Sequence, residues 1–412
     1  MTTAPKPYIA ILHYAAPPTI GGVESTIATH ARLLIEHGYA VKIIAGRAEQ
    51  FDPRIPVQII PLLDSRHSFV SEVNQKLNRG IIPSDFLPLT TAIRHTLQEA
   101  LIDVDVCIAH NIPTLHKNLA LTNALHELTQ MGKPRFIAWC HDFAWEDPVY
   151  ANDVHNGLPW DLLRQAWQGV QYVVVSDTRR GELANLLRIP MTQIAVVPPG
   201  VDALEFLGAT ETTARRIREL HLLDAAPLCL LPARVTRRKN IELAIAITAA
   251  VWERGFAPKL VVMGPLGPHN PANISYLDEL RGLQTKLGVQ GHVIFLQEHG
   301  AVDDASRRDL YQLADLLLFP SAREGFGIPI LEAGLMHLPI FCSDIPPFRE
   351  SAREWGHYFA LDESPATIAE QLVDFLDRDA RYQMKQHVLR EYAWEQIFAE
   401  SIEPLIASTQ QT

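Results

Sequence analysis

The chain has 412 residues, of which 47% are apolar and 20% are charged, a composition typical of a globular protein and not of a disordered or fibrous one. At about 150 residues per domain, a chain of this length is expected to form two or three domains. The 36 Lys and Arg residues against 47 Asp and Glu residues give a net charge of −11, so the chain as a whole has no attraction to nucleic acid phosphates.

The spacing of the cysteines and the length of the apolar runs indicate the cellular compartment of the protein. Cys107, Cys140, Cys229 and Cys342 lie too far apart for a CxxC metal site and do not form a disulfide framework, so free thiols in a reducing compartment are expected. The longest apolar stretch, residues 243–252, is well short of the roughly 20 residues that span a bilayer, and the N-terminus lacks a signal-peptide pattern. We therefore expect a cytoplasmic protein without a transmembrane segment. Peripheral membrane contact and the oligomeric state stay open.

Short apolar runs alternate with segments of helical period in the first half of the chain. Residues 8–13 form the first run, and a Gly-Gly turn, a helix pattern that stops at Gly38 and a second run at residues 40–45 follow it. Runs that are apolar on both faces predict a parallel sheet covered by helices on both sides. Further strands are expected at residues 57–60, 104–109, 135–140, 172–175 and 194–197, whereas residues 61–90 show no pattern beyond loop and short helix.

A second series begins after a boundary near residues 198–212. Its expected strands are residues 228–233, 260–263, 293–296, 316–319 and 339–342, and a helix is expected at residues 240–253. Two such blocks predict two doubly wound α/β domains with parallel sheets. The predicted division is an N-terminal domain at residues 1–200, a C-terminal domain at residues 201–366, and helices at residues 367–412 that pack across the domain pair.

Ligands of doubly wound folds bind beyond the carboxyl ends of the strands, so polar residues that follow strands are candidates for a site in a cleft between the halves. After the strand that ends near Pro320, two glycines permit a tight turn and a helix begins near Gly327, whose N-terminus suits a phosphate or diphosphate. Glu324 and Glu332 could each hold hydroxyl groups, one on a sugar and one on a ribose. Alternatively, Glu324 is a partner of the helix dipole and Glu332 is a solvated helix residue.

A dinucleotide-binding fingerprint is a weaker interpretation of the same residues. Gly325-Phe-Gly327 begins the pattern of a dinucleotide fingerprint, but Ile330 occupies the position of the third glycine.

Two cations follow the first strand of the second block. Arg234 and Lys239 are five residues apart in a strand–loop–helix junction and can converge on one anionic group. A diphosphate leaving group gains negative charge as its glycosidic bond breaks, so fixed cations would stabilise the transition state more than the ground state. The alternative is a charged surface loop with Arg237 and Arg238 at its tip.

The first block contributes its own candidates. Gly21 and Gly22 open the first helix and offer backbone amides to an anion, as glycines in plain turns also do. His141 and Asp142 follow the strand that ends at Cys140, and His110, at another strand end, competes with His141 for the same role.

No residues predict a metal site. Asp103-Val-Asp105 mimics a DxD metal motif but begins a buried strand, and the sequence contains no HExxH motif and no Cys/His cluster. The chemistry is therefore expected to be independent of metal.

Together these segments resemble family 4 of the retaining glycosyltransferases, which have the GT-B fold of two facing Rossmann-like domains with a C-terminal helix crossing between them. The resemblance covers nearly the whole chain in order and rests on these segments: Pro18-Thr-Ile-Gly21-Gly22-Val-Glu24, Pro198-Pro-Gly-Val-Asp202, Arg234 with Lys239, Asp315-Leu-Leu-Leu-Phe-Pro-Ser321, and Glu324-Gly-Phe-Gly-Ile-Pro-Ile-Leu-Glu332. The chain departs from the family at residues 335–338, where the family usually has a small residue near His337.

The resemblance implies a role for each candidate in transferring a glucose- or mannose-type hexose from a nucleotide-diphosphate sugar to a hydroxyl acceptor. The sugar nucleotide is a co-substrate and no cofactor is implied. The implied catalytic residues are His141, Glu324, Arg234 and Lys239. In this assignment His141 lies beside the donor sugar, Glu324 contacts the hexose, and Glu332 holds the ribose. The remaining implied donor contacts are Gly21, Gly22, Phe326, Gly327 and Ile328, with Arg234 and Lys239 on the diphosphate.

The acceptor and two alternative functions stay open. Glu24, Asp142 and Trp145 are acceptor candidates in a region where Trp139, Phe143, Tyr150 and Trp160 also gather, and these aromatic residues could equally belong to the core. A nucleotide-sugar epimerase and a non-catalytic nucleotide-sugar binding relative of the same fold are the alternatives. The donor base, the hexose and the linkage cannot be inferred from the sequence.

Overall fold

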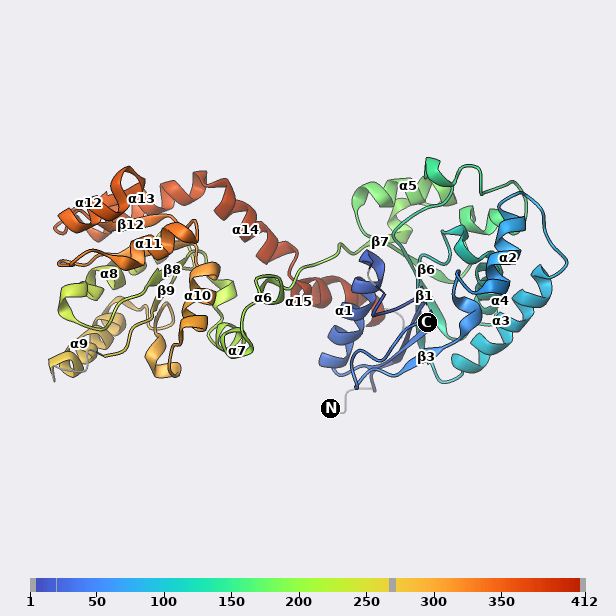
Figure 1. Ribbon diagram of the computed structural model, residues 1–412, viewed down its shortest axis with the longest axis horizontal. Helices are drawn as coiled ribbons and strands as arrows, with labels where there is room; N and C mark the ends of the chain where they lie inside the picture. Colours follow the sequence, from blue (N-terminus) through green and yellow to red (C-terminus); the bar gives the residue numbers. More distant parts are fainter. Residues whose placement is uncertain (1–4, 20, 267–271, 408–412) are drawn as a thin grey trace. The chain divides into compact units, whose positions relative to one another are not determined.

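The computed structural model describes residues 5–19, 21–266 and 272–407, and the chain forms two compact units (Figure 1). The first unit comprises Met1–Gly200 together with Trp394–Thr412, and the second comprises Val201–Ala393. Ile20, part of the segment that resembles the family near the first helix, and residues 408–412 of the expected C-terminal helices lie outside the described residues.

The described part of the first unit contains a seven-stranded parallel sheet in the order β3-β2-β1-β4-β5-β6-β7. Its strands are β1 (Tyr8–Ala15), β2 (Ala40–Arg47), β3 (Val57–Ile59), β4 (Val106–His110), β5 (Arg135–Cys140), β6 (Val170–Val174) and β7 (Ile194–Val196). Because the order runs outward in both directions from β1 and β4, the chain reverses its direction of winding between these two strands. In doubly wound folds this reversal marks the place of ligand binding.

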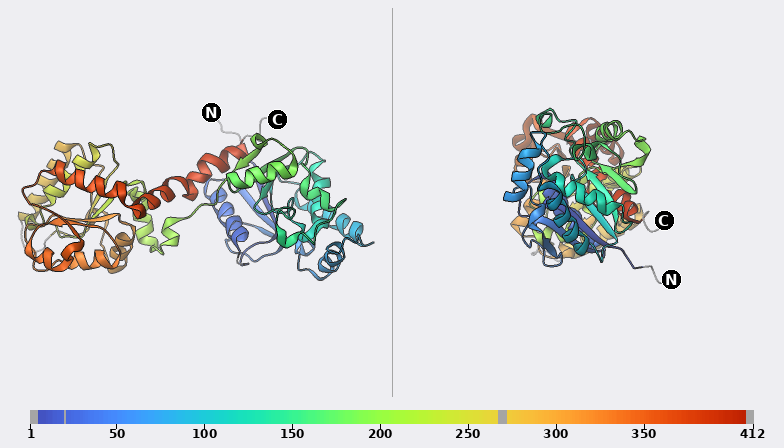
Figure 2. Two further views of the ribbon diagram at one scale, coloured as in Figure 1. Left: turned by 90° about the horizontal axis from the view of Figure 1, so that it is seen from above. Right: turned by 90° about the vertical axis from the view of Figure 1, so that its right-hand side faces the viewer.

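Helices cover both faces of this sheet (Figure 1 and Figure 2). Ile9 and Ile11 of β1 pack on one face with α1 and with apolar side chains of residues 397–406, whereas Ala10 and Leu12 pack on the other with α2, α3 and α4. This alternation follows from the strand period of two and confirms a sheet that is buried on both sides. The helices of this unit are α1 (Gly22–Glu36), α2 (Ser68–Leu77), α3 (Phe86–Ala100), α4 (Leu119–Thr129), α5 (Asp177–Leu187), α15 (Trp394–Ile397) and α16 (Glu403–Ala407).

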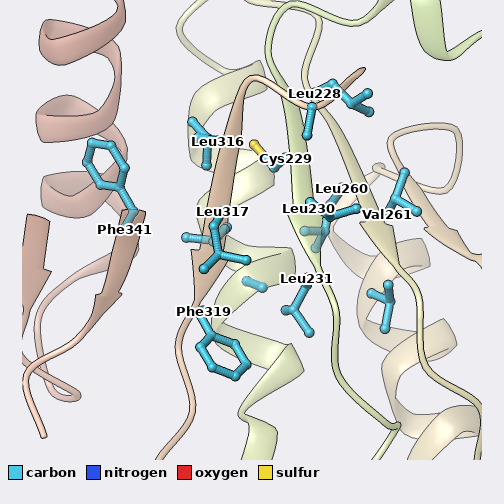
Figure 3. Packing of buried hydrophobic residues seen from close by; sticks show 14 of the residues in the cluster. Leu228, Cys229, Leu230, Leu231, Leu260, Val261, Leu316, Leu317, Phe319 and Phe341 are labelled. Atoms are coloured by element: carbon cyan, nitrogen blue, oxygen red, sulfur yellow. The ribbon is translucent and has the colours of Figure 1, made fainter. Parts of the chain in front are cut away.

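The second unit repeats the architecture with a six-stranded parallel sheet among its described residues, in the order β10-β9-β8-β11-β12-β13. Here the winding reverses between β8 and β11. The strands are β8 (Leu228–Leu231), β9 (Lys259–Val262), β10 (Val293–Phe295), β11 (Leu316–Phe319), β12 (Ile340–Ser343) and β13 (Gly356–Phe359). Figure 3 shows the leucines of β8 and β11 packed side by side in the core of this sheet.

The helices of the second unit pack around one continuous core. They are α6 (Ala203–Phe206), α7 (Glu211–Glu219), α8 (Ile241–Trp252), α9 (Ala272–Leu287), α10 (Asp304–Leu313), α11 (Ile328–Leu335), α12 (Pro346–Ala352), α13 (Pro365–Arg378) and α14 (Ala380–Glu391). Among these described residues and those of the first unit, no helix is both long and apolar enough to cross a membrane.

The C-terminal segment belongs to both units. Helices α13 and α14 lie within the second unit, and the chain after Ala393 lies within the first. Ile397, Phe398, Ile402 and Ile406 join the core beside α1. The segment predicted as one set of helices therefore contributes to two separate cores. The predicted three-part division, with helices packing across the domain pair, stays a prediction.

One departure from the family has a visible conformational consequence. His337, at the end of α11, has φ +56°, in the left-handed region that favours glycine. The N–H of Leu338 then bonds to the carbonyl of Ala333 and ends the helix. Glycine at this position would adopt this conformation with less strain because it has no Cβ.

Candidate active site

The candidate residues of the second unit lie where the winding of its sheet reverses. Lys239 ends the loop that follows β8, and Glu324 lies in the loop that follows β11. These strands are neighbours in the sheet, so their carboxyl ends bring the two loops together although 85 residues separate them. A backbone hydrogen bond of 2.9 Å from Ala322 N–H to the Arg238 carbonyl joins the loops directly.

Lys239 and Glu324 form an ion pair in which the Lys239 Nζ donates to Glu324 Oε1. Both side chains are only 9% exposed, and Arg238 Nη1 donates to the second carboxylate oxygen over 3.2 Å. Glu324 is therefore compensated by two cations, one buried and one exposed. The sequence did not predict a direct contact between these two side chains, because it assigned Lys239 to a diphosphate and Glu324 to a hexose without linking them.

The surroundings of Lys239 are partly apolar. Its Nζ lies 5.0 Å from the centre of the Phe319 ring. Burial lowers the pKa of the Lys239 ammonium group, and the hydrogen bond with Glu324 opposes this shift. Because little water surrounds the Lys239 ammonium group, its attraction to a second anion would be only weakly screened by solvent.

The other cations of this loop differ in their surroundings. Arg234 is exposed and has no hydrogen-bond or ion-pair partner among the residues that the structure describes. Arg237 pairs with Glu279 over 2.6 Å, on the side of α9. Arg234 therefore lies exposed at this loop, whereas Arg237 is held on the surface by Glu279, and a role for either in binding an anion stays a prediction.

Helix α11 begins where the sequence predicted. Gly327 precedes it with φ +97°, and a Cβ there would lie 2.9 Å from the Phe348 ring, so only glycine fits without a shift. Phe326 and Ile328 on either side are 46% and 63% exposed. The first N–H groups of a helix have no partner within it, so this exposed turn is suited to an anion.

Glu332 lies in the second turn of α11 and is held by α10. Tyr311 Oη donates to Glu332 Oε2 over 2.7 Å, and Arg307 Nη1 lies 3.4 Å from Oε1. Burial and the Glu332 carboxylate raise the pKa of Tyr311, so the phenol remains a proton donor to this carboxylate. The sequence analysis did not identify Tyr311, because its link to Glu332 depends on how two helices pack.

The first unit has its own candidates at the reversal between β1 and β4. Gly21 is extended and precedes α1, and Gly22 is its first residue. A Cβ on Gly21 would lie 2.2 Å from Glu24 Oε2, whereas one on Gly22 would have nothing within 4 Å. The Glu24 carboxylate therefore folds back over Gly21, and Gly22 stays open to a close approach.

His141 is linked to the neighbouring strand end by side chains. His110 Nδ1 lies 3.0 Å from His141 Nε2, and the rings stack with centroids 5.4 Å apart. Asn111 Oδ1 accepts from the backbone N–H of His141 over 2.7 Å, and Asn111 Nδ2 donates to the Asp142 carboxylate over 3.1 Å. His110, which competed with His141 in the sequence, is thus its direct partner.

Both imidazoles are neutral at pH 7. Burial lowers the pKa of His141 to about 4, while the nearby Asp142 carboxylate opposes the shift. Burial and the neighbouring histidines lower the pKa of His110 well below its usual value. His141 therefore offers an uncharged imidazole that can donate from one ring nitrogen and accept at the other.

Of the acceptor candidates, Trp145 already has partners within the first unit. The Trp145 indole N–H donates to the Trp160 carbonyl over 3.2 Å, and the Arg164 guanidinium covers its ring at 3.8 Å. Trp139, Phe143 and Trp160 are at most 3% exposed and belong to the core. An acceptor role for Glu24, Asp142 and Trp145 stays a prediction.

The DxD-like pair has structural partners. Asp103 pairs with Lys42 over 2.7 Å, and Asp105 accepts from the Tyr8 backbone N–H over 2.8 Å. Both acids precede β4, at the amino end of the sheet and opposite to His141. In the described part of the chain, no group of three or more His, Cys, Asp or Glu residues is arranged to hold a metal ion. Independence from metal remains a prediction.

Two parallel-sheet units, each with a reversal of winding, define a protein of the doubly wound, Rossmann-like class. Residues 20–203 match the family model for Glycosyltransferase Family 4, and residues 215–396 match the model for Glycosyl transferases group 1. The two matches together cover most of the chain. The chain belongs to glycosyltransferase family 4, as the sequence resemblance predicted.

Two relatives illustrate the similarity. A mannosylglucosylglycerate synthase of Thermotoga maritima is 25% identical over 375 residues, which are 82% of each chain. An uncharacterized glycosyltransferase of Methanocaldococcus jannaschii is 28% identical over 245 residues, which are 57% of this chain and 60% of that protein. The solved structure of a glycosyltransferase from Rickettsia africae aligns with 99% of each chain at 16% identity, with a TM-score of 0.39 that is too low to support an inference.

Proposed function

We propose that the protein is a retaining hexosyltransferase that moves a glucose- or mannose-type sugar from a nucleoside diphosphate to a hydroxyl acceptor. The bond between the anomeric carbon and the diphosphate oxygen breaks, and a bond from that carbon to the acceptor oxygen forms on the same face. The acceptor proton passes to the leaving diphosphate, so the products are the glycoside and the nucleoside diphosphate.

The observation that carries this proposal is the buried pairing of Lys239 with Glu324 beside the start of α11. A cation for the diphosphate and a carboxylate for sugar hydroxyls would be needed within a few ångströms of each other in a nucleotide-sugar site. Arg234, exposed and unpaired among the described residues, supplies a second cation. Fixed charges of this kind would stabilise the negative charge that develops on the leaving group.

The remaining roles follow the chemistry of each group. Phe326, Gly327 and Ile328 offer backbone amides to the phosphate and sugar, and Gly21 and Gly22 do so in the first unit. Glu332, oriented by Tyr311, accepts from the ribose hydroxyls. His141 donates to a hydroxyl of the transferred hexose. The name of the Thermotoga relative supports a mannosyl or glucosyl group, and the acceptor remains to be identified.

An epimerase or a binding protein of the same fold is the second candidate. Either would bind the nucleotide sugar, but neither would form a glycoside. Lys239 and Arg234 would bind the diphosphate in each case, but only a transferase also uses their charge to stabilise the departing diphosphate.

The test is a screen of UDP-, GDP- and ADP-sugars, read by thermal shift for binding and by nucleotide release for turnover. The proposal expects one base and one hexose to stabilise the protein, and nucleotide release that depends on an added acceptor. Release of free hexose alone, or conversion of the sugar without release, would favour the alternatives. In excess EDTA we expect donor binding and turnover to persist, and a loss restored by Mg²⁺ would contradict the metal-free mechanism.

A further inference from the structure

Three histidines form a row in the first unit. His30 on α1, His110 at the end of β4 and His141 after β5 have ring centroids 5.8 and 5.4 Å apart. His30 is 2% exposed and His110 is fully buried, whereas His141 is only partly buried. The row therefore leads from the core to a side chain to which we assign a role on the substrate.

The contact between His110 and His141 requires a single shared proton. Their Nδ1 and Nε2 atoms are 3.0 Å apart, and two neutral imidazoles can bond in this way only if one donates and the other accepts. If His110 donates, His141 carries its proton on Nδ1. If His141 donates, its Nδ1 is a bare lone pair and His110 must bury an N–H at Nε2.

The surroundings favour donation by His110. Asn111 holds the Asp142 carboxylate, whose negative charge acts on the His141 imidazole and favours a ring N–H over a lone pair on the side that faces it. At the inner end, His110 Nε2 and His30 Nδ1 are both buried and neither has a hydrogen-bond partner among the described residues. Donation by His110 leaves only a lone pair at His110 Nε2, whereas donation by His141 would leave a buried N–H there without an acceptor among the described residues.

We propose that His110 is a positioning residue that fixes His141 in one orientation and as its Nδ1–H tautomer. This inference rests on the proposed role of His141 in hexose transfer. Asn111 holds the backbone of His141, and because His141 Nε2 is bound by His110 the ring cannot turn without losing a part-buried hydrogen bond. His141 then meets the sugar as a neutral donor from Nδ1 and does not act as a base.

The test is the ¹⁵N shift of each ring nitrogen of His141 at pH 7, from long-range ¹H–¹⁵N spectra of the histidine-labelled protein. A His141→Asn variant assigns the signals. We expect a protonated, pyrrole-type Nδ1 and an unprotonated, pyridine-type Nε2. A protonated Nε2 would overturn the assignment. This readout needs no turnover, so it is decided even if the protein transfers no hexose.

Variants of His110 separate positioning from packing. His110→Phe keeps an aromatic ring but removes the hydrogen bond, and we expect the His141 nitrogens to show mixed tautomers and kcat to fall about 10- to 100-fold with donor affinity unchanged. His110→Gln retains a donor and should restore part of both. His126→Phe, which removes a histidine of α4 that packs on Trp167, is the control and should change neither. An unchanged tautomer pattern in His110→Phe would overturn the proposal, and if that variant does not fold, His110→Gln and the wild-type spectrum decide it.

Discussion

Lys239 and Glu324 compensate each other's charge in a place from which water is largely excluded. When a nucleotide sugar binds, we expect the diphosphate to attract the ammonium group and a sugar hydroxyl to donate to the carboxylate. The ligand then takes over part of the role that each side chain has for the other. The two buried charges are thus in place before the ligand binds, so they do not need to be reorganised later.

The pair predicts an asymmetric effect on stability. Glu324→Ala leaves Lys239 buried without a partner, whereas Lys239→Met leaves Glu324 still bonded to Arg238. We expect a loss of about 3 kcal/mol for Glu324→Ala and about 1 kcal/mol for Lys239→Met in urea unfolding, with a double variant less destabilised than the sum. Equal losses in the two single variants would contradict the shared compensation by Arg238.

A substitution at Gly22 can distinguish an effect on ligand binding from an effect on stability. A Cβ at this position has nothing within 4 Å, and alanine is the better helix former, so Gly22→Ala should fold with at least wild-type stability. If the diphosphate approaches its backbone, the added methyl group should still lower donor affinity about tenfold or more. Calorimetric binding and a thermal melt of the same sample check both parts, and wild-type affinity would remove Gly22 from the site.

Among the elements, helix α11 depends on the glycine that immediately precedes it. Gly327→Ala forces an alanine into φ +97° and against the Phe348 ring, so we expect a loss of at least about 1 to 2 kcal/mol and of nucleotide binding. Gly325→Ala is the matched control, because a Cβ there meets nothing within 4 Å. Comparable losses in both variants would mean that the conformation at Gly327 does not set the position of the helix.

The sequence predicted the central strands well but not the peripheral elements. Runs such as residues 316–319 are apolar on both faces and flanked by turns, so their pattern identifies them. Strand β13 was missed because only Phe359 of its four residues is buried, as expected at the edge of a sheet. Helix α2 lies in residues 61–90, where the sequence showed no pattern beyond loop and short helix, since it buries only the narrow stripe of Val70, Val73 and Leu77. Helix α3 begins near the end of that segment and extends beyond it to Ala100.

The sequence predicted where the candidate residues lie in the fold, but not which side chains contact one another. Polar residues after parallel strands mark a site because the topology brings strand ends together, and Lys239, Glu324 and His141 were found in this way. The contacts of Arg238 with Glu324, of Tyr311 with Glu332 and of His110 with His141 depend on side-chain geometry across long sequence separations. That geometry depends on loop conformation and helix packing, which local patterns do not encode.

At the scale of the whole molecule, the two units differ in their buried histidines. His30, His116 and His141 of the first unit have pKa values lowered to about 3, 4 and 4, chiefly by burial, and the pKa of His110 is also lowered. In the described second unit, a clear lowering is found for His357. Because the unfolded chain binds more protons than the folded one between about pH 6.5 and pH 4, stability falls as pH drops through this range.

We therefore expect the first unit to unfold before the second on acidification. Each buried neutral histidine contributes up to about 1.4 kcal/mol per pH unit between its unfolded and folded pKa. Limited proteolysis at pH 7 and pH 5 with an acid-tolerant protease, read by mass spectrometry, should show new cleavage in residues 5–200 at the lower pH. Cleavage that begins within residues 201–393 would contradict this assignment.

In the proposed function, Glu324 holds the hexose and Glu332 holds the ribose of one nucleotide sugar. Isothermal titration of the bare nucleoside diphosphate and of the nucleotide sugar into the Glu324→Ala and Glu332→Ala variants tests it directly, with a thermal melt to show that both remain folded. We predict that Glu332→Ala weakens both ligands about 10- to 100-fold, the worth of a charge-assisted hydrogen bond. Glu324→Ala should weaken only the nucleotide sugar. Equal loss of bare-nucleotide affinity in the two variants would contradict the account.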